Sequence, residues 1–373
     1  MLKRLKNKKE ILRKNPIVRF GAQCVIFPSY VQRFSMFKKF LKKYIKMTDK
    51  TYYNKEELEK NIPQADIYCT GSDQVWNSEW NEKIEYPFFL DFVPDDKKRI
   101  SYAASFGKKS LVPEEVEETR RLVNKYQYLS MREISGVDIL KKLGRNDGIN
   151  VLDPTLLLNK KEWLKIASSK YNSKNYVLMY NLNRNKKIDK YVEKLAREKN
   201  LDIYYISYNL HECFKKGKMK CNVKVEDFLS LIANASYVVT DSFHATAFSI
   251  NFNTPFMIIF PEKFSTRLAS ILEVTGLQDR IVEDYNDIKL ADKILNKKDC
   301  TGCRACEQIC PVKAISMKED DEGFITPKVD EERCIKCGLC KKTCGQIDRF
   351  YNKNNLVERK FLGVRPKEKE IAK

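Results

Sequence analysis

Eight of the twelve cysteines have the spacing that most clearly predicts chemistry in this sequence. They form two runs of one pattern, in which two residues separate each of the first three cysteines and three residues precede the fourth. The runs are Cys300, Cys303, Cys306, Cys310 and Cys334, Cys337, Cys340, Cys344. Thiols at such short, repeated spacing are typical of metal ligands and not of disulfides. Zinc is the alternative metal, but zinc sites usually take two pairs of ligands, which this spacing does not provide.

The two runs closely resemble a bacterial two-cluster ferredoxin. In that arrangement, three thiolates on one tight loop bind three irons of a cubane, and the fourth cysteine binds the other cluster. The resemblance assigns one [4Fe–4S] cluster to Cys300, Cys303, Cys306 and Cys344, and the other to Cys310, Cys334, Cys337 and Cys340. Gly345 stands where the ferredoxin motif usually has proline, which affects local rigidity and not ligation.

From residue 65 onward, short apolar runs alternate with helical patterns. This alternation predicts parallel sheets covered by helices, and therefore an α/β protein with two Rossmann-like lobes. A small α+β ferredoxin-like domain follows. The expected segments are a basic helical segment at 1–60, an incomplete N-terminal lobe at 61–155, a C-terminal lobe at 156–290, the ferredoxin domain at 296–346 and a basic tail at 347–373.

Two loops that follow predicted strands carry polar side chains. Ser72 and Asp73 follow one strand, while Asp241, Ser242 and His244 follow another. Ligands of such folds bind beyond the carboxyl ends of the strands, so these loops are candidate sites. A histidine at a strand-to-helix turn can transfer protons, and the helix amides beside it favour an anion. The alternatives are an ordinary capped turn for the first loop and a capping or core role for the histidine.

Four segments together resemble the polysaccharide pyruvyl transferase family, over roughly residues 50–280. They are Gly71–Asn77 (GSDQVWN), Leu129–Glu133 (LSMRE), Leu152–Leu158 (LDPTLLL) and Thr240–Phe248 (TDSFHATAF). The family is similar in fold to two-domain glycosyltransferases, with the active site in the cleft between the domains. Its members transfer the enolpyruvyl unit of phosphoenolpyruvate to two sugar hydroxyls, which gives a cyclic ketal and phosphate. The resemblance therefore implies a transferase of exopolysaccharide or cell-surface glycan biosynthesis, with a sugar or lipid-linked glycan as acceptor.

The resemblance also implies roles for individual residues. His244 matches the motif histidine and is expected to act as acid/base or phosphate ligand, with Asp241 orienting it. Arg132 is expected to bind the anionic substrate, since planar guanidinium groups suit carboxylates and phosphates. Many relatives have an arginine where this chain has Ser242, and Arg267 or Lys263 could supply the missing charge. The expected substrate-binding residues are Ser72, Asp73, Ser242 and Arg267, with Asp73 either binding an acceptor hydroxyl or capping its loop. His211 is interpreted as an ordinary surface residue.

The sequence also departs from the family at its front. Members usually begin with a strand and an Asn/Gly-rich loop, and this opening βα unit is missing here. The segment Phe361–Arg365 resembles the start of a deazaflavin-dependent hydrogenase/dehydrogenase beta-subunit region. We therefore expect the chain to be the middle of a longer fusion, and transferase activity in isolation to be less certain than family membership.

The chain is strongly basic, with 70 Lys and Arg against 50 Asp and Glu and a formal net charge of +20. Residues 1–60 hold 17 basic and 5 acidic side chains, a balance of +12. One interpretation is a solvated basic helix face, and another is attraction to an anionic membrane surface or a polysaccharide intermediate. The sequence has no nucleic-acid-binding motif, so no nucleic-acid partner is expected.

No apolar run approaches the roughly 18–20 residues that cross a bilayer. The basic N-terminus lacks the apolar stretch of a secretory signal, so we expect a cytoplasmic protein, at most peripheral at the inner face of the membrane. A hydrophobic fraction of 43% excludes wholesale disorder.

Two other hypotheses stay open. In the first, the chain is an iron–sulfur electron-transfer subunit that partners a flavin or deazaflavin oxidoreductase, and the two lobes are a degenerate docking scaffold. The sequence has no flavin- or nicotinamide-binding loop, so the electron partner would be a separate protein. In the second, the clusters only stabilise the fold.

Overall fold

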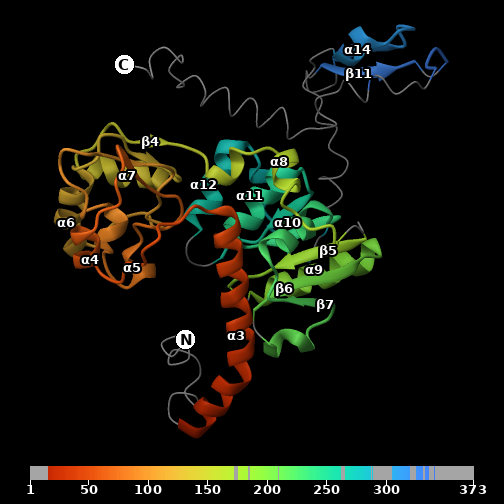
Figure 1. Ribbon diagram of the computed structural model, residues 1–373. Coiled ribbons are helices and arrows are strands. Elements are labelled where there is room, and N and C mark those ends of the chain that lie inside the picture. The colour runs from red at the N-terminus through yellow and green to blue at the C-terminus, as the bar shows by residue number, and fades with distance from the viewer. Residues whose placement is uncertain are drawn as a thin grey trace.

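The protein consists of two α/β lobes, a long helix beside them and a small α+β unit, as the computed structural model in Figure 1 shows. The predicted fold class is confirmed. The structure describes residues 16–171, 175–183, 185–208, 210–261, 265–286, 288, 305–319, 325–330, 332–335 and 340.

The N-terminal lobe contains four short parallel strands. Strand β1 pairs with β2, β3 pairs with β4, and isolated bridges from Ile100 to Tyr128 and from Ala104 to Met131 connect the two pairs. Its core includes the buried Trp76, whose ring stacks on Phe89 at 5.0 Å between centroids. The elements of this lobe are α4 (Lys55–Lys60), β1 (Ile67–Thr70), α5 (Ser78–Asn81), β2 (Lys98–Ser101), α6 (Pro113–Val123), β3 (Ser130–Met131), α7 (Ile134–Lys142) and β4 (Ile149–Asn150). The long helix α3 (Pro16–Tyr44) and the short helix α8 (Lys160–Leu164) pack on the C-terminal lobe.

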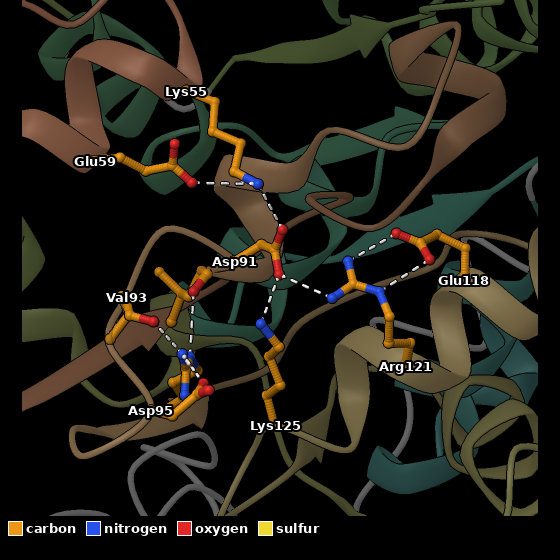
Figure 2. Close-up of polar contacts among 10 residues, drawn as sticks. Lys55, Glu59, Asp91, Val93, Asp95, Glu118, Arg121 and Lys125 are labelled. Atoms are coloured by element: carbon orange, nitrogen blue, oxygen red, sulfur yellow. Dashed lines mark hydrogen bonds and ion pairs between the residues drawn. The ribbon is translucent and has the colours of Figure 1, made fainter.

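A buried carboxylate ties two of these helices together (Figure 2). Asp91 accepts hydrogen bonds from Lys55 of α4 and Lys125 after α6, both at 2.9 Å, and from Arg121 of α6 at 3.3 Å. Burial would raise the pKa of Asp91, but the three cations outweigh it and hold that pKa well below its usual range. The attachment of α4 and α6 to each other through Asp91 therefore depends on the ionised form of this carboxylate.

The C-terminal lobe is a five-stranded parallel sheet in the order β7-β6-β5-β8-β9. The strand order reverses between β5 and β8, which is the point where ligands bind in open α/β sheets. Helix α9 packs on one face of the sheet, and α10 and α11 cover the other. The elements are β5 (Tyr176–Tyr180), α9 (Lys186–Lys199), β6 (Asp202–Ser207), β7 (Lys218–Cys221), α10 (Val225–Ala233), β8 (Tyr237–Thr240), α11 (Phe243–Phe252), β9 (Phe256–Ile258) and α12 (Thr266–Thr275).

The small unit contains helix α14 (Ala305–Ile309) and the antiparallel strands β10 (Ile315–Glu319) and β11 (Ile325–Val329). Four cluster cysteines lie outside the described residues, namely Cys300, Cys303, Cys337 and Cys344, as do Lys263 and the predicted basic tail. Within the described residues 16–66, the structure has α3 and α4 and no strand before β1. The domain boundaries remain a prediction.

Candidate active site between the lobes

Three polar residues follow strands of the N-terminal lobe and meet at its edge. Arg132 directly follows β3, and its two terminal nitrogens donate to Asp73 Oδ1 and Asp153 Oδ2, each at 2.8 Å. Asp73 lies in the loop after β1, where Gly71 has a φ of +120° and a Cβ would stand 2.0 Å from the Tyr102 carbonyl oxygen. Only glycine fits that close approach, so the loop conformation that presents Asp73 depends on it.

The C-terminal lobe supplies the opposite side of the site. Phe243 and His244 are the first two residues of α11, and Arg267 lies in the first turn of α12. The Arg132 guanidinium stacks over the Phe243 ring at 4.4 Å, while the Arg267 guanidinium lies 6.0 Å from the same ring. Arg267 Nη1 is also 3.7 Å from Asp73 Oδ1. Residues of both lobes therefore converge around Phe243, and the structure brings Arg132 and His244 together.

The charges of this cluster set the protonation of its members. Burial alone would raise the pKa of Asp73 and of Asp153, but the charge and the hydrogen bond of Arg132, together with smaller contributions from their other neighbours, outweigh burial and lower both. Burial lowers the pKa of His244 in spite of the nearby Asp153 and Asp73, which favours the neutral imidazole. Among the described residues, none is hydrogen-bonded to that imidazole, which is partly exposed.

Arg267 differs from Arg132 in its pairing. Burial and the charge of Arg132 lower the pKa of Arg267, so its own surroundings disfavour its positive charge. Its Nε is buried and has no hydrogen-bond partner among the described residues. A guanidinium in this state gains more from an incoming anion than Arg132, whose terminal nitrogens already bind two carboxylates.

Two predicted catalytic residues have other contacts in the structure. Arg132, expected as an anion clamp, is buried and uses both terminal nitrogens to bind Asp73 and Asp153. Asp241, expected to orient His244, instead accepts from the Leu182 and Asn183 amides at 2.7 and 2.9 Å, which holds the loop after β5. This contact forms because the ends of β5 and β8 are adjacent in the sheet.

The two predicted serines also have defined places. Ser242 is buried and caps α11, with its hydroxyl accepting from the Ala245 amide at 3.4 Å. A hydroxyl at the N-cap is the usual way to satisfy the first amides of a helix, and it leaves this oxygen less available to a substrate. Ser72 is partly exposed, next to Asp73 in the loop after β1.

Two acidic residues of the site were not singled out from the sequence, although both lie in the quoted motif segments. Asp153 caps the short helix Pro154–Leu156 and binds Arg132. Glu133 is buried and accepts from the Ser105 hydroxyl, and its other oxygen has no partner among the described residues. Burial raises the pKa of Glu133 against the opposing charge of Arg132, which favours the neutral carboxyl.

A small hollow of about 10 Å³ lies behind Arg132 and Phe243, next to Ser270 of α12. It holds at most about one water, so it is not a substrate pocket. Asp73, His244 and Arg267 are not among its lining residues, and their side chains are half or partly exposed to solvent.

The described cysteines of the small unit fit the role of cluster ligands. Cys310, Cys334 and Cys340 are free thiols and form no disulfide. The Ala314 amide donates to Cys310 Sγ at 3.3 Å, and amide hydrogen bonds to ligand sulfurs are one way in which proteins tune iron–sulfur clusters.

Comparison with known protein families shows to which family the chain belongs. The model of the polysaccharide pyruvyl transferase family matches residues 12–259, which include Asp73, Arg132, Asp153 and His244. The chain belongs to this family. A 4Fe-4S dicluster domain matches residues 299–346, which confirms the prediction of iron–sulfur clusters in the cysteine module.

Several curated proteins are similar to short parts of this family member. An iron-sulfur subunit of the CoB–CoM heterodisulfide reductase of Methanocaldococcus jannaschii is 28% identical over 106 residues, which are 24% of this chain and 16% of that protein. One of the subunits of the F(420)H(2) dehydrogenase of Methanosarcina mazei is 28% identical over 87 residues, or 21% of this chain and 25% of that protein. The chain thus spans a quarter or less of these two relatives.

Among solved structures, a UDP-N-acetylglucosamine 2-epimerase from Rickettsia bellii is similar with a TM-score of 0.37 and 14% identity. The match covers 65% of this chain and 74% of the epimerase. None of the described helices has the length and hydropathy needed to cross a bilayer.

Proposed function

We propose that this family member transfers the pyruvyl group of phosphoenolpyruvate to two hydroxyls of a glycan sugar. The observation that carries the proposal is the cluster between the lobes, where a partly exposed His244 and an incompletely paired Arg267 lie near the half-exposed Asp73. This set contains the groups that the chemistry requires, namely a cation for the donor and groups that can exchange protons.

Arg267 is proposed to bind the donor, because phosphoenolpyruvate carries a carboxylate and a phosphate. Its guanidinium has donors to spare, and an anion would relieve its repulsion from Arg132. The first amides of α11, at Phe243 and His244, have no carbonyl partner within the helix and add a positive field on the same side. Arg132 then acts as a positioning residue that keeps Asp73 ionised and in place.

His244 is proposed to exchange protons with the reactants. In the reaction, C3 of the enolpyruvyl unit gains a proton and one sugar hydroxyl adds to C2. The C2–O bond to phosphate then breaks, and the second hydroxyl attacks C2. The two hydroxyl protons are thereby balanced by the new methyl hydrogen and the proton on the departing phosphate. The lowered pKa of His244 leaves the imidazole neutral and ready to accept a hydroxyl proton, and Asp73 can accept a hydrogen bond from the acceptor sugar.

The first experiment measures phosphoenolpyruvate binding to the full chain by calorimetry, which needs no knowledge of the acceptor. Arg267→Lys should weaken binding about 10- to 100-fold, the loss expected for a charge-assisted contact. Arg145→Lys is the matched control, because Arg145 pairs with Asp147 on the surface. Equal affinities for the two variants would contradict the assignment, and a wild-type chain that does not bind phosphoenolpyruvate would overturn the proposed donor.

The second experiment follows phosphate release and the mass of the acceptor across a panel of nucleotide-linked sugars. His244→Gln should lower turnover by about 10²–10⁴-fold. His211→Gln, which changes the only other histidine of the chain, should leave it unchanged. Unaltered turnover in His244→Gln would remove the histidine from the mechanism.

For the cysteine module, we infer that its two clusters exchange single electrons with a flavin or deazaflavin oxidoreductase. The residues that would hold them are the eight cysteines of the two runs. The names of similar proteins, a component of an F(420)H(2) dehydrogenase among them, support this inference. An anaerobic preparation should contain about eight irons per chain and bleach reversibly on reduction. A colourless preparation loaded with zinc would contradict it.

A further inference from the structure

The long helix α3 presents a row of large apolar side chains to solvent. These residues recur at alternating intervals of three and four, so they share one face of the helix. Phe27 is 58% exposed and Phe34 is 62% exposed, although side chains of this size are usually buried. The exposed row consists of Phe27, Tyr30, Phe34, Phe37, Leu41 and Tyr44, and we call it the apolar stripe.

A different face of α3 attaches the helix to the C-terminal lobe. The Asn222 amide donates to the Ser29 carbonyl oxygen at 3.2 Å and to Gln32 Oε1 at 2.8 Å. The Arg33 guanidinium stacks over the Tyr208 ring at 5.3 Å. Ser29 and Arg33 are partly buried, as are Met36 and Phe40 one and two turns further along. The apolar stripe is therefore not the surface by which α3 packs on the protein.

The charged residues of α3 are all basic, and by helical spacing Lys38 and Lys42 lie along one side of the stripe, whereas Lys39 and Lys43 lie on the far side of the helix. From residue 16 to residue 48, the sequence has no Asp or Glu. Within the same stretch it has two arginines and five lysines, namely Arg19, Arg33, Lys38, Lys39, Lys42, Lys43 and Lys46. Against a second copy of α3 these cations would repel one another, whereas an anionic surface would neutralise them.

We propose that α3 lies flat on an anionic lipid bilayer and attaches the protein to it. The apolar stripe would enter the boundary between headgroups and acyl chains, and Lys38 and Lys42 beside it would extend to the anionic headgroups. The stripe runs for about 25 Å along the helix. Figure 1 shows the N-terminal end of α3 extending beyond the two lobes, while the rest of the helix runs beside the C-terminal lobe. This attachment is independent of the proposed transferase activity.

Flotation of the full chain with phospholipid vesicles tests the proposal. The protein should bind vesicles that contain about 30 mol% phosphatidylglycerol and not pure phosphatidylcholine vesicles, and about 0.5 M NaCl should weaken the binding. Replacing Lys38 and Lys42 with Gln should lower the partition coefficient by about 25-fold, at about fivefold for each lysine. The matched control replaces two exposed lysines elsewhere, namely Lys141 and Lys165, and should change it little.

A second variant, Phe27→Gln with Phe34→Gln, tests the stripe itself and should also reduce binding to anionic vesicles. Both side chains are exposed, so the thermal unfolding midpoint should not fall, which separates lost attachment from lost folding. Equal binding to neutral and anionic vesicles, or an equal loss in the control pair, would overturn the proposal. So would a dimer in sedimentation that the Phe27/Phe34 variant dissociates while lipid binding is absent, because the stripe would then belong to a second copy.

Discussion

Replacing Asp153 with Asn should destabilise the N-terminal lobe by about 3 kcal/mol. The Asp153 and Arg132 side chains are each 1% exposed and joined at 2.8 Å. Removing one partner of a buried ion pair usually costs about 3–5 kcal/mol, because the other charge stays buried without compensation. Asp73 still binds Arg132 in the variant, so we place the cost at the lower end of this range.

Urea unfolding measures this cost, followed by tryptophan fluorescence, to which the buried Trp76 of the same lobe contributes. The matched control is Asp147→Asn, since Asp147 binds Arg145 at 2.7 Å but has a side chain that is 53% exposed. Exposed pairs contribute about 0–1 kcal/mol. Similar losses for Asp153→Asn and Asp147→Asn would refute the argument that burial makes the Arg132 pair important.

The same pair has a predicted pH dependence. In the folded protein burial raises the pKa of Asp153, but the charge of Arg132 and the hydrogen bonds to the carboxylate together lower it, so the unfolded chain binds the proton more tightly. The stabilisation is then complete above the ordinary carboxyl pKa of about 4 and is lost as the pH falls below it. The difference in unfolding free energy between wild type and Asp153→Asn should therefore shrink from about pH 6 to about pH 3. A difference that grows with acid would contradict the direction of the shift.

Three further predictions concern other carboxylates. Asp91→Asn should lower the free energy of unfolding in urea by about 2–3 kcal/mol, because it leaves three cations around a neutral amide. An unfolding midpoint equal to that of the wild type would count against a stabilising role of these ion pairs. Glu133→Gln should lower the free energy of unfolding by less than about 1.5 kcal/mol in the same assay, because the raised pKa of Glu133 already favours the neutral carboxyl. A loss larger than that of Asp153→Asn would show that the fold needs Glu133 as an anion. The Leu182 and Asn183 amides donate hydrogen bonds to the Asp241 carboxylate, so Asp241→Ala should speed their hydrogen exchange by about 10-fold. Unchanged exchange would mean that other contacts hold the loop.

Much of the C-terminal lobe followed from local sequence pattern. Strands β5 and β8 are buried on both faces, so each forms a continuous apolar run that sequence pattern can detect, and helix α10 has apolar residues at helical spacing. Strand β7 (Lys218–Cys221) has no such run, because lysines alternate with Met219 and Cys221 and the strand lies at the edge of the sheet. Edge strands often carry lysine, which hides them from a search for apolar runs.

By itself, the sequence determined the family and most of the order of strands and helices, and it predicted the eight cluster cysteines, because short motifs and local periodicity encode each of these. Only the tertiary structure decided which polar and charged groups pair with one another. Arg132 binds Asp73 and Asp153, which are 59 and 21 residues away, and Asp241 holds the loop after β5 instead of His244. Such pairings depend on how strands of two sheets line up at their ends, and no local pattern of residues records that alignment.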